Sequence, residues 1–208
     1  MPAGRLAAPL ALVLAAIMCC LAACSQPAEP SPSPTMPSPP STASPPPSAT
    51  SPVAPSDGDT VPIDPDLLDA LPEEVEGIPL LRTDEALTDV VGDSGLLAFA
   101  DAVAAGLVLD QATGDFAYAT VVRPRVDPVP DEVFRDWRST YDEGVCAQAG
   151  GVAGIAEAEV GGRPTFIGTC AGGVRTYHVL LGNRGLLVSV SATGERRLGE
   201  RLVEGLRD

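Results

Sequence analysis

Residues 174–192, VRTYHVLLGNRGLLVSVSA, decide the fold. Two runs rich in β-branched and aromatic residues flank the loop GNRG at 182–185, a pattern typical of a β-hairpin. A four-residue loop fixes the register, because successive side chains of a strand point to opposite faces. This register places six apolar side chains on one face of the hairpin: Tyr177, Val179, Leu181, Leu186, Val188 and Val190. Other parts of the chain must cover this face.

The same register pairs His178 with Ser189 on the opposite face. A Ser-His pair on neighbouring strands invites a catalytic-triad interpretation, with an aspartate as third member. However, Ser189 lies in mid-strand, without the sharp turn or the Gly-x-Ser-x-Gly motif that exposes a nucleophile. The pattern favours a cross-strand polar pair on the less buried face, and no catalytic residue is predicted.

Two more strands precede the hairpin, at 153–160 and 163–170, so that four antiparallel strands form a meander. After the hairpin, segment 194–206 carries leucines at four-residue spacing, which predicts a helix with Thr193 as its possible cap. The sequence therefore predicts an α+β fold, in which helices pack on one face of an antiparallel sheet.

The chain before the meander predicts further elements in order. A short helix near Asp66 and a short strand at 77–81 precede a helix over 93–106, capped by Ser94 and ended by Gly106. A hairpin of strands 106–111 and 115–123 follows. The last predicted element before the meander is a helix over 131–146. Its apolar stripe comprises Val133, Phe134, Trp137, Tyr141 and Val145, and Trp137 is the residue that we expect to anchor the helix in the core.

Cys146 and Cys170 are predicted to form a disulfide, since both follow an export signal and disulfides form in oxidising compartments. Closing a loop of about 25 residues stabilises a fold by roughly 3 kcal/mol in the chain-entropy model. Two free buried thiols are the alternative. A redox enzyme is disfavoured, because no Cys-x-x-Cys motif is present.

The N-terminal segment 1–23 has the form of a secretory signal peptide, with Arg5 before an apolar run that is short for a membrane span. The run ends in LAAC at 21–24, which resembles the signal of bacterial lipoproteins. The resemblance implies cleavage before Cys24, an S-diacylglyceryl group and an N-acyl group on this cysteine, and anchoring at the outer face of the cell membrane. Cys19 and Cys20 lack the small residues that must precede a lipidated cysteine.

The segment 24–60 is rich in proline and serine, which predicts a disordered, extended linker without a core. Residues 61–208 then have the length of a single globular domain. This part resembles domains of uncharacterised actinobacterial lipoproteins, a resemblance that implies no activity.

Composition limits the possible partners. The formal net charge of −15 argues against nucleic acid, and the chain contains no lysine and one histidine. No motif for a cofactor or a metal ion is present, so none is predicted. We expect a non-enzymatic binding module that contacts an envelope protein, a wall component or a small ligand. A carboxylate-dependent envelope hydrolase is the alternative, with candidate acids Asp127, Asp131, Glu132 and Asp142, and a purely structural role is a third possibility.

Overall fold

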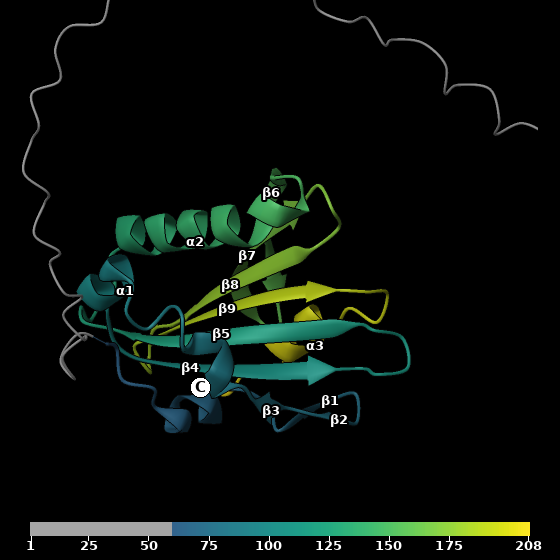
Figure 1. Cartoon of the computed structure of the whole chain (residues 1–208), viewed down its shortest axis with the longest axis horizontal. Coiled ribbons are helices and arrows are strands. Elements are labelled where there is room, and N and C mark those ends of the chain that lie inside the picture. The colour runs from purple at the N-terminus through teal and green to yellow at the C-terminus, as the bar shows by residue number, and fades with distance from the viewer. Residues whose placement is uncertain (1–59) are drawn as a thin grey trace, which may run out of the picture. The chain divides into compact units, whose positions relative to one another are not determined.

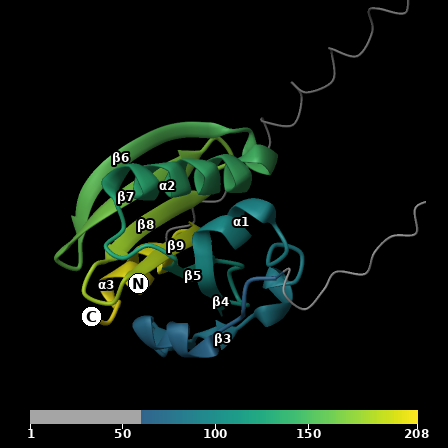
Figure 2. The same cartoon turned by 90° about the vertical axis from the view of Figure 1, so that its left-hand side faces the viewer.

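The structure is a computed structural model that describes residues 60–208, which belong to one compact unit. The predicted signal peptide, the lipid acceptor Cys24 and the linker up to residue 59 lie outside the described residues. A seven-stranded antiparallel sheet forms the centre, in the order β3-β4-β5-β9-β8-β7-β6 (Figures 1 and 2). Its strands are β3 (Leu81–Arg82), β4 (Ala100–Leu109), β5 (Phe116–Pro124), β6 (Val152–Val160), β7 (Arg163–Cys170), β8 (Arg175–Leu181) and β9 (Leu186–Thr193).

Helices and one small sheet surround these strands. The α-helices are α1 (Ser94–Phe99), α2 (Asp131–Cys146) and α3 (Leu198–Glu204). The 3-10 helices are η1 (Pro65–Ala70), η2 (Asp84–Leu87) and η3 (Ala147–Ala149), and β1 (Glu74–Val75) pairs with β2 (Ile78–Pro79). None of the helices in residues 60–208 has both the length and the apolar character needed to cross a membrane.

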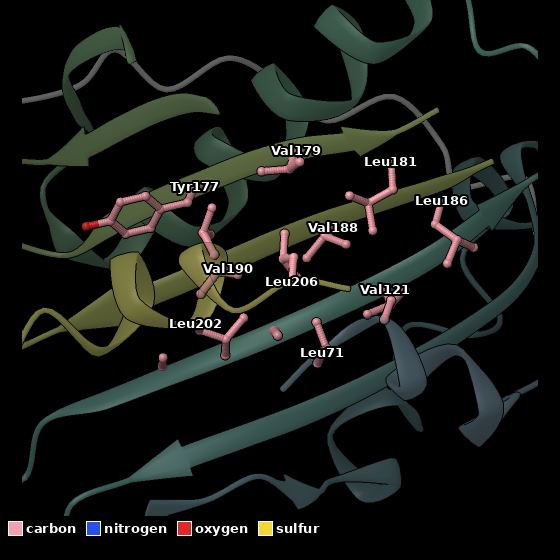
Figure 3. Packing of buried hydrophobic residues seen from close by; sticks show 14 of the residues in the cluster. Leu71, Val121, Tyr177, Val179, Leu181, Leu186, Val188, Val190, Leu202 and Leu206 are labelled. Atoms are coloured by element: carbon pink, nitrogen blue, oxygen red, sulfur yellow. The ribbon is translucent and has the colours of Figure 1, made fainter. Parts of the chain in front are cut away.

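The β8–β9 hairpin has the predicted register. Leu181 pairs with Leu186, and Tyr177 pairs with Val190. The six apolar side chains of this face belong to one buried cluster, together with Leu198, Leu202 and Leu206 from the C-terminal segment (Figure 3). The predicted meander and C-terminal helix are therefore confirmed, although the residue that precedes α3 as its N-cap is Arg197 and not Thr193.

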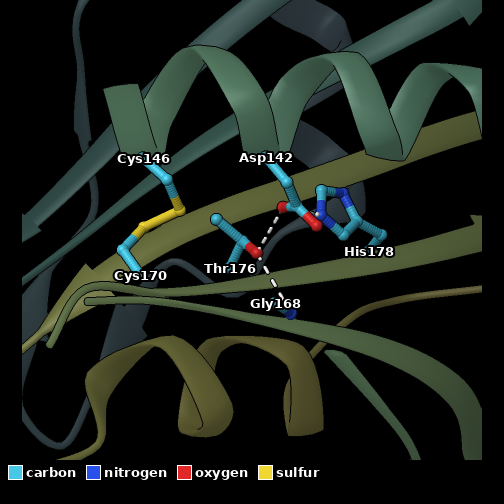
Figure 4. The surroundings of a disulfide bond; sticks show 6 residues. All are labelled: Asp142, Cys146, Gly168, Cys170, Thr176 and His178. Carbon is cyan, nitrogen blue, oxygen red and sulfur yellow. Dashed lines mark hydrogen bonds and ion pairs between the residues drawn. A yellow bond between two sulfur atoms is a disulfide. The ribbon is translucent and has the colours of Figure 1, made fainter. Parts of the chain in front are cut away.

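The α+β class is confirmed, but the expectation that the helices share one face of the sheet is wrong. Helix α3 packs on the face of Tyr177, whereas α2 packs on the face of His178 (Figure 4). The reason lies in the strands, which carry apolar residues on both faces. Leu187 is fully buried on the α2 side, next to Val188 on the α3 side, so both faces need a cover.

The predicted helix over 93–106 is shorter than expected. Helix α1 ends at Phe99, and its cap is Asp93, whose carboxylate accepts hydrogen bonds from the N–H groups of Gly95 and Leu96. Residues from Ala100 onward form β4 instead, between β3 and β5. These small residues are buried on both faces of the sheet, and this packing overrides the helix propensity of alanine.

Helix α2 has the predicted bounds, and its C-terminal end is joined to the sheet. The predicted disulfide between Cys146, at the end of α2, and Cys170, at the end of β7, is present (Figure 4). Under α2 lies a second apolar cluster that includes Phe134 and Leu187. Trp137 stacks on Phe99 of α1, with 4.9 Å between ring centroids.

Candidate functional site

A buried polar network lies between α2 and the sheet. The His178 Nδ1 atom is 2.9 Å from the Ser189 Oγ atom, and the His178 Nε2 atom is 2.8 Å from Asp142 Oδ1. The predicted cross-strand pair is thus present, with Asp142 of α2 as a third member. The expectation that this face is the less buried one is wrong, because His178 and Ser189 are each only 1% exposed beneath α2.

Further groups complete the network. The Trp137 indole N–H donates to Ser189 Oγ at 2.9 Å, the Thr176 hydroxyl donates to Asp142 Oδ1 at 2.5 Å, and the Gly168 N–H donates to Thr176 Oγ1 at 3.1 Å. When the His178 proton is on Nε2, the Ser189 hydroxyl donates to Nδ1 and Nε2 donates to Asp142. Each of these donors then has an acceptor, which makes the network a strong constraint on the position of α2.

The network has the composition of a Ser-His-Asp triad but not the access that a nucleophile needs. Ser189 is in the middle of β9, its residue is 1% exposed, and its oxygen already accepts the Trp137 N–H. A substrate has no path to this oxygen in the structure. We therefore assign the network to holding α2 on the sheet.

Asp142 is the ionised member of the network. Burial raises the pKa of Asp142, but the hydrogen bonds from His178 and Thr176 outweigh burial and bring the pKa below its ordinary value of 3.8. A lowered pKa means that the folded state holds the carboxylate more firmly in its charged form than the unfolded state does. The resulting stability is complete above about pH 4 and is lost as the pH falls through the folded-state pKa.

We therefore expect the stability difference between the parent and Asp142→Asn to depend on pH. At pH 7 the variant should have the lower free energy of unfolding, and this gap should narrow as the pH falls below about 4 and the parent also loses the carboxylate. Urea denaturation at a series of pH values measures the gap. A gap that is constant across this range contradicts the assignment.

Gly168 allows α2 to approach the sheet. A Cβ atom at this position would collide with Thr176 Oγ1 and would lie 2.7 Å from Asp142 Oδ2. Gly168→Ala should therefore lower the free energy of unfolding by about 1–3 kcal/mol, the usual cost of overpacking. Gly154→Ala in the neighbouring strand is the matched control, since a Cβ atom there meets nothing within 4 Å. Equal losses in the two variants would contradict the close approach.

Two hollows flank α2. The first, which we call the apolar cavity, has a volume of about 810 Å³ and lies between α2, α1, η2, β4 and β5. Its apolar walls come from Leu87, Val90, Leu96, Phe99, Val103, Val133 and Trp137. The second, which we call the β6 groove, has a volume of about 460 Å³ and lies between α2, β6 and β7. Asp142 and His178 line the β6 groove, so the network forms part of its wall.

A buried hydroxyl without a partner belongs to the lining of the apolar cavity. The Tyr141 hydroxyl oxygen is buried and has no hydrogen-bond partner, although the rest of the side chain is partly exposed. Burial raises the pKa of Tyr141 to about 12, more than the nearby Ser191 and Thr120 hydroxyls lower it, so the phenol keeps its proton. Unpaired buried donors are rare in native proteins. The oxygen is fully buried, with the Ser191 and Thr120 hydroxyls as nearby polar groups, so a molecule in the cavity does not reach it in this structure.

The charged residues of the apolar cavity are all acidic. Asp89, Asp93 and Asp136 line it and are exposed to solvent, whereas its lining includes no arginine or histidine. The potential at its mouth therefore favours neutral or cationic molecules over anions.

The four carboxylates of the hydrolase hypothesis differ in burial, and Asp142 is well separated from Asp131. Asp127, Asp131 and Glu132 are exposed, whereas Asp142 is buried. Asp131 and Asp142 are at opposite ends of α2, about 16 Å apart along its axis at 1.5 Å per residue. The hypothesis requires a buried acid with a raised pKa in a cleft, and the pKa of Asp142 is lowered. Within residues 60–208, no three His, Cys, Asp or Glu side chains are grouped to hold a metal ion.

Comparison with known proteins gives no relative for this chain. No protein-family model matches it, and neither a curated protein nor a solved structure matches it significantly.

Proposed function

We propose that this chain is an exported lipoprotein that binds a small, predominantly apolar molecule in the apolar cavity. The LAAC motif and the proline-rich linker support the first part, with Cys24 as the lipid acceptor and the outer face of the cell membrane as its place. The second part rests on the geometry beside α2.

The observation that carries the binding proposal is the size of the apolar cavity together with its apolar and aromatic lining. Ligand pockets typically have volumes of about 300–1,000 Å³, with apolar walls and a few polar groups that orient the ligand. The apolar cavity has about 810 Å³, with Trp137 and Phe99 in its wall and Tyr118, Thr120 and Thr140 among its lining residues that carry a hydroxyl.

The charge of the lining restricts the ligand further. Three aspartates and no cation line the cavity, so an anionic head group is disfavoured. A neutral or cationic amphiphile fits the walls and the rim together. The acidity of the whole chain likewise disfavours nucleic acid as a partner.

The test uses three probes with the same ten-carbon chain and different heads: decanol, decyltrimethylammonium and decanoate. Trp137 is the only tryptophan of the chain and lines the cavity, so its fluorescence reports binding. The full-length chain should bind the neutral and the cationic probe saturably and decanoate more weakly. Equal binding of all three, or none at all, would contradict the proposal.

The assignment of Cys24 as the lipid acceptor is tested independently of the cavity. Cells given a labelled fatty acid should incorporate label into the parent chain and not into Cys24→Ser, because a thioether forms only on sulfur. Label on the serine variant would overturn the assignment of Cys24.

A further inference from the structure

Strand β6 leaves a full-length sheet edge unpaired. It pairs with β7 on one side, and no strand within residues 60–208 lies on its other side. Eight of its nine residues are exposed. At the opposite end of the sheet, β3 is only two residues long. Within the described part of the chain, β6 is therefore the sheet edge with room for a long added strand.

Native proteins usually block such an edge with proline, lysine, a bulge or a short strand. The sequence of β6, VAGIAEAEV, has neither proline nor lysine, and its one register shift lies at the start, between Val152 and Gly154. Ile155 is 82% exposed, which is more than any other large exposed hydrophobic side chain in residues 60–208. The main-chain groups from Gly154 to Val160 are thus open to a partner.

The two faces of this edge differ in chemistry. Ile155 and Glu157 pair with Gly168 and Phe166, which face α2, so Ile155, Glu157 and Glu159 are on the α2 face. Ala156 and Ala158 alternate with them on the other face. A strand added here meets two carboxylates on one face and small apolar side chains on the other.

The β6 groove receives side chains on the α2 face. Its lining includes Ile155 and Glu157 of the edge strand, with Arg135 and Arg138 of α2 across the groove. Arg138 is already engaged, since its guanidinium carbon stacks on Phe166 at 3.6 Å from the ring centroid. Arg135 is exposed on the α2 side of the groove, whereas an added strand pairs directly with β6, so the charges nearest to its side chains are those of Glu157 and Glu159.

We propose that the outer edge of β6 is a docking site for an extended segment of a partner protein, in which basic and apolar residues alternate. The segment adds as an eighth strand, with its main chain bonded to β6 and its basic side chains beside Glu157 and Glu159. This site is separate from the apolar cavity and does not depend on its ligand.

A second copy of this chain is a poorer occupant. In an antiparallel pair of β6 strands centred on Ala156, Glu157 of one copy lies diagonally opposite Glu157 of the other, within reach of like-charge repulsion. The net charge of −15 on each copy adds to this repulsion. The acidic edge thus favours a basic partner over self-association.

The test measures binding of the synthetic peptide VKVKVKV to the full-length chain by fluorescence anisotropy, with hydrogen–deuterium exchange as a second readout. We expect saturable binding and slower exchange confined to residues 152–160, because outward amides gain hydrogen bonds when a strand is added. The peptide VKPKVKV has the same three lysines, but its proline removes a main-chain donor from the strand, so it should bind at least about tenfold more weakly.

A double variant that reverses two charges on β6 tests whether the peptide binds there. Glu157→Lys with Glu159→Lys should weaken VKVKVKV binding by about tenfold or more and should create binding of VEVEVEV. Glu85→Lys with Glu195→Lys changes the net charge equally at exposed positions outside β6 and the β6 groove, and should leave the affinity within about twofold. The proposal would be overturned if the two pairs had equal effects, or if VKPKVKV bound as tightly as VKVKVKV. Protection outside β6, self-association through β6, or the absence of binding would each overturn it as well.

Discussion

Replacing His178 with leucine should lower the free energy of unfolding at pH 7 by about 3–5 kcal/mol, the cost of breaking a buried polar pair by removing one partner. His178 is 1% exposed and donates to the Asp142 carboxylate, which keeps only the Thr176 hydroxyl in the variant. The Ser189 hydroxyl also loses its acceptor. Chemical denaturation with circular dichroism measures the change.

A double variant separates the unpaired charge from any loss of packing. Adding Asp142→Leu to His178→Leu removes the carboxylate that the single variant leaves without its partner. Since apolar replacement of both members of a buried pair is often neutral, the double variant should recover at least about half of the lost stability. If the double variant is less stable than the single one, the account of Asp142 as a buried charge held by His178 is wrong.

Replacing Cys146 and Cys170 together with serine should cost about 3 kcal/mol, which is the second large effect that we expect. The bond closes a loop with a sequence separation of 24 and joins the end of α2 to the end of β7. Without it, the unfolded chain gains conformational freedom and α2 is held by its packing and the polar network alone.

The cost of this substitution has a direct control in the parent protein. Reducing the parent with dithiothreitol should lower its stability by the same amount as the serine variant, and should not affect that variant further. Unequal losses would mean that the serines, which are placed at two buried positions, cause the effect instead of the missing bond.

Helix α2 connects the stability of the fold to the proposed binding site. The same helix places Asp142 in the polar network and Trp137 and Tyr141 in the wall of the apolar cavity. Because Trp137 also donates to Ser189, the network sets the orientation of one cavity wall. Variants that break the network should therefore weaken ligand binding as well as stability.

The C-terminal half of the fold follows from local patterns. The loop 182–185 fixed the register of β8 and β9, and α2 has one apolar stripe between clear breaks. The sequence predicts a helix where residues 100–105 form the first part of β4, because the alanines there have helical propensity and only the pairing with β5 makes them a strand. The helices were expected on one face, since the second apolar face of β8 and β9 was not recognised.

The candidate site was only partly accessible from sequence. The pairing of His178 with Ser189 follows from the hairpin register, but Asp142 joins them from an element 36 residues away from His178. One signal was available: Asp142 is adjacent to Tyr141 and three residues before Val145 in the apolar stripe, so it lies near the sheet-facing side of α2. The apolar cavity had no such signal, because α1, η2, β5 and α2 enclose it only after the chain has folded.

Native mass spectrometry of the full-length chain, purified from its own export pathway, tests the binding proposal most directly. The native mass should exceed the denatured mass by the mass of a small molecule. The molecule that is released on denaturation should be neutral or cationic. Val133→Trp, which fills the apolar cavity, should abolish the extra mass, whereas Val126→Trp, at an exposed position outside it, should keep it. Equal native and denatured masses, with no gain in mass on incubation with decanol, would contradict the proposal that this cavity binds a small molecule.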